Sequence, residues 1–239
     1  MANQLGPELF LYAALGGMLP PLLWLWFWLH EDDVRPEPRG MIMLTFISGM
    51  VAVPIAIFFE EMTQRIFPLL SSSSPFKIIL WAAIEEILKY LSVRFGAFET
   101  GYFDEPIDAV MYMMTAALGF AALENTFFLL SVLRDSGFVE WFATGNARFL
   151  GATVLHTVSS SLVGAAVGFT FYRSKWVKVV AVLIGLTTAT LLHSAFNFFI
   201  IQSEGKNIME VFFVLWMIAI LAMIIFEKVR NTRPKPERK

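Results

Sequence analysis

Ionisable side chains inside apolar segments are the residues of this chain that are best placed to do chemistry. Glu85, Glu86 and Lys89 stand in the apolar segment around AIEEILKY, and Glu124 stands in LGFAALEN. A charge at the centre of a bilayer costs at least about 2.5–3.5 kcal/mol on insertion scales, so such residues are rare unless they are paired or functional. Four more polar residues follow in apolar surroundings: Asn125, His156, His193 and Asn197.

Carboxylates and imidazoles in one membrane pocket fit two chemistries. A glutamate can act as general base on a water molecule that attacks an amide, while histidine or asparagine donors stabilise the oxyanion. The same groups can instead carry protons or ions in a transporter. A third alternative is a noncatalytic membrane scaffold. Residue types alone do not separate these functions.

The polar residues also have structural interpretations. Lys89 follows Glu86 by three residues and Glu85 by four, so either glutamate can pair with it along one helix. Asn125 and the serines at 159–161 are typical of hydrogen bonds between membrane helices. A single histidine inside a membrane can serve the same purpose.

Membrane helices are expected to hold these residues in place. The chain has 239 residues, of which 57% are hydrophobic and only 16% are charged, whereas soluble domains have about 25% charged residues. We predict an all-α polytopic membrane protein with about seven transmembrane helices, forming a single transmembrane domain over residues 1–239. The predicted spans are residues 8–29, 41–59, 76–95, 107–131, 149–172, 176–200 and 208–226, with a short segment, SGFVEWFATGN, before the fifth.

The composition also excludes several kinds of site and partner. Because the chain has no cysteine, disulfides, thiolate metal sites and thiol nucleophiles are excluded. The tail at residues 227–239 is a juxtamembrane basic segment next to membrane lipids, and it is too short to favour nucleic acid. Its basic residues are Lys228, Arg230, Arg233, Lys235, Arg238 and Lys239.

The distribution of basic residues predicts an orientation, because basic residues gather in cytoplasmic loops. With the N-terminus outside, the cytoplasmic side carries twelve basic residues and the outer side carries five. We therefore expect the N-terminus outside and the C-terminus in the cytoplasm.

Depth along the predicted helices brings the polar residues to one level. At 1.5 Å rise per residue, Glu85 lies roughly 14 Å below the outer end of its helix. Glu124, His156 and His193 each lie roughly 10 Å below the outer ends of theirs. Four consecutive helices therefore place carboxylates and imidazoles in one layer of the outer half, where they can surround a water-filled pocket.

These motifs resemble those of a known family. Glu-Glu-x-x-Lys at 85–89 resembles the first motif of the PrsW family of bacterial membrane proteases. FDEPIDAVMY and then LGFAALEN, with Phe120 and Glu124, resemble the second motif. His156, followed by His193 with Asn197, resembles the third and fourth polar positions. The resemblance covers residues 76–199, about half of the chain, and places the catalytic helices at about 76–200.

The family is related to the CAAX prenyl proteases, which implies a CAAX-protease-like helical bundle. His193-Ser-Ala-Phe-Asn197 matches the last motif of that group. The chain departs from it at Lys89, which replaces an arginine at a shorter spacing, and at Glu124, which replaces a histidine. The resemblance implies an endopeptidase of the bacterial plasma membrane. Its substrate would be a single-pass membrane protein, typically an anti-sigma factor, cut on the extracytoplasmic side as site-1 cleavage.

On this interpretation Glu85 is the general base, Glu86 supports it and Lys89 is their charge partner. Glu124 and His156 bind the water or a metal, and His193 and Asn197 stabilise the tetrahedral intermediate. Metal dependence stays open at this point. Zn²⁺ could bind the two-histidine, one-carboxylate set Glu124, His156 and His193. The alternative is metal-free, with Glu85 and a histidine activating water and Asn197 in the oxyanion hole.

Overall fold

The computed structural model describes residues 6–31, 36–71, 73–202 and 206–234, and these residues form helices and no strand. The all-α prediction is confirmed. A short 3₁₀ turn, Ala97–Glu99, follows α3. The α-helices are α1 Pro7–Glu31, α2 Arg39–Ile66, α3 Pro75–Arg94, α4 Asp108–Asp135, α5 Phe138–Leu150, α6 Ala152–Phe169, α7 Lys175–Gln202 and α8 Ile208–Arg230.

Six helical stretches of the described chain are long and apolar enough to cross a membrane, so the chain is a polytopic membrane protein. One of them, Phe138–Phe169, contains both α5 and α6. Helix α3 is not among the six because it carries too many charges, including the Glu85, Glu86 and Lys89 group. Of the basic tail, Lys235, Arg238 and Lys239 lie outside the described residues.

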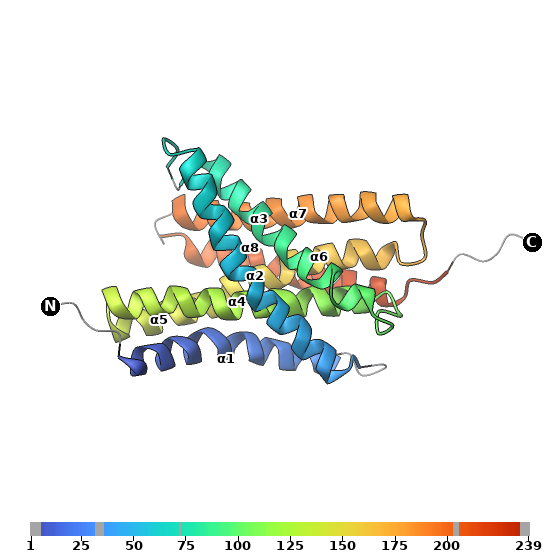
Figure 1. The fold of residues 1–239 in the computed structure, drawn as a ribbon, viewed down its shortest axis with the longest axis horizontal. Helices are drawn as coiled ribbons and strands as arrows, with labels where there is room; N and C mark the ends of the chain where they lie inside the picture. Colours follow the sequence, from blue (N-terminus) through green and yellow to red (C-terminus); the bar gives the residue numbers. More distant parts are fainter. Residues whose placement is uncertain (1–5, 32–35, 72, 203–205, 235–239) are drawn as a thin grey trace, which may run out of the picture.

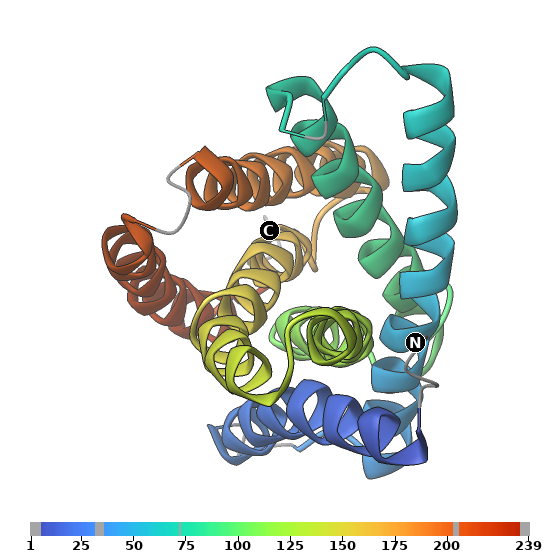
Figure 2. The same cartoon turned by 90° about the vertical axis from the view of Figure 1, so that its left-hand side faces the viewer.

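Helix α4 is the centre of the bundle. Its first half is almost fully buried, and α1, α2 and α6 pack around it (Figure 2). Two glycines permit the crossing of α2 and α4, because a Cβ at Gly49 or Gly119 would collide with the backbone of the opposite helix. Helices α2 and α3 cross the other helices obliquely (Figure 1). This crossing carries the acidic motif of α3 towards α6 and α7.

Two elements differ from the sequence prediction. Helix α2 continues to Ile66, beyond the predicted end at residue 59, because its polar last turns pack on α3. There, Trp81 Nε1 donates to Thr63 Oγ1 at 2.8 Å, and Lys77 Nζ donates to Gln64 Oε1 at 2.6 Å. The segment that was expected only as a connection before the fifth span forms the separate helix α5, which buries none of its residues.

Candidate active site

Glu86 of α3 is the most enclosed carboxylate of the site, with 0% exposure. Its Oε1 accepts from Lys89 Nζ at 2.8 Å and lies 2.9 Å from Nδ1 of His193 on α7. Its Oε2 accepts from the Ser160 hydroxyl at 2.7 Å, and Ser159 lies 3.3 Å from Oε1. Both oxygens are therefore occupied, which leaves Glu86 well placed to hold its neighbours and poorly placed to take up a proton.

His156 of α6 connects the acidic motif of α3 to α4. Its Nδ1 lies 2.8 Å from Lys89 Nζ, and its Nε2 lies 3.0 Å from Glu124 Oε2. Because an ammonium group can only donate, Nδ1 accepts from Lys89 and Nε2–H donates to Glu124. The ring also meets that of His193 edge to face, with ring centres 5.0 Å apart.

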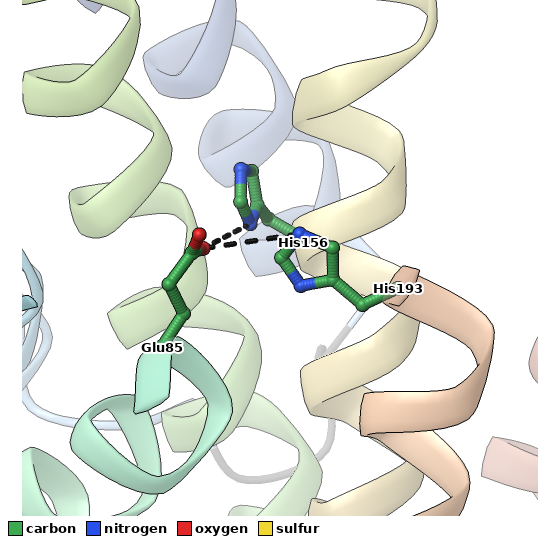
Figure 3. A group of neighbouring side chains, drawn as sticks. All are labelled: Glu85, His156 and His193. Carbon is green, nitrogen blue, oxygen red and sulfur yellow. Dashed lines mark ion pairs between the residues drawn. The ribbon is translucent and has the colours of Figure 1, made fainter. Parts of the chain in front are cut away.

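Glu85 faces both imidazoles from one side (Figure 3). Its Oε2 is 3.8 Å from Nδ1 of His156 and 3.8 Å from Nε2 of His193. Lys89 Nζ is 3.5 Å from the same oxygen. Within the described residues no hydrogen bond is made to Glu85 Oε1, in contrast to the occupied oxygens of Glu86. Glu85 is therefore the carboxylate that is free to act on a substrate or a water molecule.

Glu124 of α4 stands at the edge of the site, with 32% of its side chain exposed. Besides His156, its Oε2 receives Arg148 Nη2 of α5 at 2.5 Å. The guanidinium also donates from Nε to Asn125 Oδ1 at 2.5 Å and lies over the Phe128 ring. The sequence analysis did not identify Arg148, because residue 148 lies just before the predicted fifth span at 149–172. The signal that could have found it is its position at the end of the amphipathic segment just before the His156 helix.

Two further polar residues, Asn197 and Glu60, lie near this network. Asn197 lies one turn after His193 on α7 and is half-buried, and in the described chain its side chain makes no hydrogen bond. Glu60, on the last part of α2, was missed because the sequence placed it beyond the end of a span. It is half-buried and close enough to Glu85 and Glu124 for their charges to interact. The structure thus brings all the predicted polar residues except Asn197 into one contact network.

The residues present fit a divalent metal ion. Glu85, His156 and His193 each offer one ligand atom, and these atoms lie within 4.8 Å of one another. Two imidazoles and one carboxylate are a common ligand set of catalytic zinc sites. The outer ring nitrogen of each histidine contacts a further carboxylate, Glu86 for His193 and Glu124 for His156. Such carboxylate partners typically orient metal-binding histidines.

This grouping differs from the ligand set predicted from the sequence. The sequence paired Glu124 with His156 and His193, whereas the structure groups Glu85 with these histidines. Glu124 instead contacts the outer nitrogen of His156 and Arg148. Depth alone could not make this distinction, because it gives the level of each residue and not the direction in which its side chain points.

Comparison with known proteins identifies the family. The family described as "PrsW family intramembrane metalloprotease" matches residues 37–224. The chain is 24% identical to "Protease PrsW" of Shouchella clausii (strain KSM-K16) over 84% of this chain and 91% of that protein. It is 25% identical to "Protease PrsW" of Bacillus subtilis (strain 168) over 76% of this chain and 79% of that protein. No solved structure gives a significant match.

The match spans most of the chain, from the start of α2 to the last turns of α8, and so includes every polar residue of the site. It supports a protease and not the transporter that the residue types alone left open. With its six apolar stretches, the chain is a multi-pass protein of a bacterial membrane. The chain belongs to the PrsW family of intramembrane proteases.

Proposed function

We propose that this protease hydrolyses a peptide bond at the group formed by Glu85, His156 and His193. The observation that supports this most directly is the convergence of three donor groups from α3, α6 and α7, with the outer nitrogen of each histidine on a second carboxylate. A carboxylate that faces two fixed imidazoles is suited to bind a water molecule and remove its proton.

Glu85 is the proton acceptor in this proposal. Its Oε1 has no hydrogen bond in the described chain, so it can accept the proton of the water that attacks the substrate carbonyl carbon. The same proton can then pass to the leaving amine. Glu86 and Glu124 hold the two imidazoles and take no part in proton transfer. Asn197, whose amide is unengaged in the described chain, can donate to the substrate oxygen from the same face of α7 as His193.

The residues suited to hold a divalent metal such as Zn²⁺ are Glu85, His156 and His193. When bound, such an ion supplies polarisation of the substrate carbonyl and of the attacking water. Lys89 now places its ammonium group 2.8 Å from His156 Nδ1, so it would have to give up this contact to a metal. Its hydrogen bond to Glu86 can remain in place, because Glu86 is not one of the three residues suited to hold the metal.

We further propose that the substrate is a single-pass membrane protein of the anti-sigma-factor type, cut near the extracytoplasmic side of the bacterial plasma membrane. The supporting observations are the family assignment, the predicted level of the polar residues, and the basic residues that favour an outside N-terminus. Glu124, as the most exposed carboxylate of the network, marks the edge at which a substrate would arrive.

The test is cleavage by the purified full-length chain, reconstituted in lipid nanodiscs with a panel of single-pass substrates. We expect cleavage by the wild type, loss of cleavage after treatment with a strong chelator, and recovery when Zn²⁺ is returned. Chelator-resistant cleavage would contradict the metal proposal but not the role of Glu85. No cleavage of any substrate by the metal-loaded protein would contradict the proposed function itself.

A further inference from the structure

A cavity is lined by residues from the ends of α3 and α6 and the start of α7. These helix ends lie on the right in Figure 1. The volume of the cavity is about 440 Å³. Lys175, which lines it, precedes His193 on α7 by roughly 27 Å of helix. The cationic end of the cavity is therefore far from the Glu85 site, and none of Glu85, His156 and His193 lines the cavity. Its properties do not depend on the function proposed above.

One side of this cavity is cationic. Arg94, Lys175 and Lys178 line it, and Glu99 is its single carboxylate. Arg94 pairs with Glu99, while neither lysine forms an ion pair with another described residue. Lys178 lies 5.6 Å from the centre of the Phe171 ring. Two positive charges are thus left for an anion to neutralise.

The other side of the cavity is aliphatic and follows one face of α7. Lys175 and Lys178 are followed by Val179, Val182 and Leu183. These spacings place all five residues on one stripe of the helix, with the charges at its end and the aliphatic groups deeper along it.

Aromatic rings form the wall that faces this stripe. Phe98 stacks on Phe103 with ring centres 4.4 Å apart, and Phe103 meets Phe171 edge to face at 5.0 Å. All three rings line the cavity. The cavity is therefore amphipathic, with cations at the end of the bundle and apolar surface that leads from them towards its middle.

We propose that this cavity binds an anionic phospholipid. Its phosphate would lie between Lys175, Lys178 and Arg94, and one acyl chain would follow Val182 and Leu183 along α7. Basic pockets between membrane helices are suited to lipid head groups. A free phosphate ion would match the cations but leave the aliphatic stripe uncovered. An uncharged membrane segment would match the stripe but leave two lysines without a counter-ion.

The experiment measures lipid bound to the purified full-length chain by native mass spectrometry, during titration with phosphatidylglycerol and, separately, with phosphatidylcholine. We expect preferential binding of phosphatidylglycerol. The double variant Lys175→Gln/Lys178→Gln should bind it about 10- to 30-fold more weakly, since each surface cation contributes on the order of a few-fold to tenfold. The matched control Lys228→Gln/Arg233→Gln removes two exposed charges at the same end of the bundle (Figure 1), outside the cavity, and should bind as the wild type does.

A second arm separates a lipid from a free anion. Val182→Trp keeps all the cations and fills the apolar half, so it should also lose phosphatidylglycerol. Leu183→Gln, at a more exposed position, provides the same test if the tryptophan variant does not fold. Excess inorganic phosphate should leave the bound lipid in place. Displacement by phosphate alone, or equal lipid binding by the lysine variant and its control, would overturn the proposal.

Discussion

Each histidine of the site lies within hydrogen-bond distance of one carboxylate, and these two carboxylates have different surroundings. Glu86 lies 2.9 Å from His193, is fully buried, and receives further hydrogen bonds from Lys89 and Ser160. Glu124 lies 3.0 Å from His156 but keeps 32% of its side chain exposed. Its other partner is an arginine from α5, a helix that buries none of its residues. The two carboxylate–histidine distances are nearly equal, whereas the burial and the other partners of the two carboxylates differ.

The difference in burial predicts different free-energy costs for removing the two carboxylates. Removing one member of a fully buried ion pair leaves the other charge without compensation and costs about 3–5 kcal/mol. At a half-exposed position, water can replace a lost partner at lower cost. The Glu86 side of the site should therefore be needed for the fold, while the Glu124 side can be altered with the fold intact. Four predictions test this comparison.

The largest effect should come from Glu85, which faces both imidazoles and holds neither. Glu85→Gln is nearly isosteric but removes the proton acceptor, so kcat should fall about 10²- to 10⁴-fold. Its helical content and resistance to denaturant should match the wild type. The measurement is initial cleavage rate in nanodiscs at saturating substrate. Near-normal kcat in this variant would assign proton transfer to one of the other two glutamates.

The next effect concerns stability. Glu86→Ala should lower the free energy of unfolding by about 3–5 kcal/mol, because Lys89 would remain buried without its closest carboxylate. Glu124→Ala should lower it by only about 1.5–3 kcal/mol, the range of a hydrogen bond to a charged group. Denaturant titration of both variants in the same detergent gives the comparison. Equal losses would show that burial does not distinguish the two carboxylates.

Arg148 tests the exposed side of the site, where it contacts Glu124. Arg148→Met should lower kcat about 10- to 100-fold with little change in KM, because Glu124 would lose the arginine that fixes its contact with His156. Arg148→Lys restores the charge and should recover part of the activity. A purely structural arginine would instead lower stability in both variants and leave the kcat of the folded fraction unchanged.

The smallest effect should come from a charge pair outside the network. Arg134 and Asp135 form an ion pair at the end of α4 in which both side chains are more than half exposed. Arg134→Gln should change neither the unfolding transition nor kcat, because solvent screens such pairs. It is the control for Arg148→Met, since each removes one arginine. A loss of activity here would mean that overall charge, and not the contact with Glu124, governs the rate.

The sequence alone determined the class of the protein and most members of its site. Apolar segments of about 20 residues specify membrane helices without reference to their neighbours. Glu85, Glu86, Lys89, Glu124, His156 and His193 stood out because each carries a polar or charged group in such a segment, where water cannot compensate it. The helical rise per residue then predicts that these residues lie at similar depths in the membrane.

Which of these residues contact one another depends on how the helices pack. Glu85 and Glu86 are adjacent in sequence and both within reach of Lys89, so helix spacing treats them alike. The crossing angle of α3 against α6 and α7 encloses Glu86 and turns Glu85 towards both imidazoles. Arg148 and Glu60 could not be found by composition, because they lie at the polar ends of helices, where charged residues are common. Their place beside the site follows from the packing of α5 and α2 against the acidic helices, which involves contacts between residues far apart in the chain.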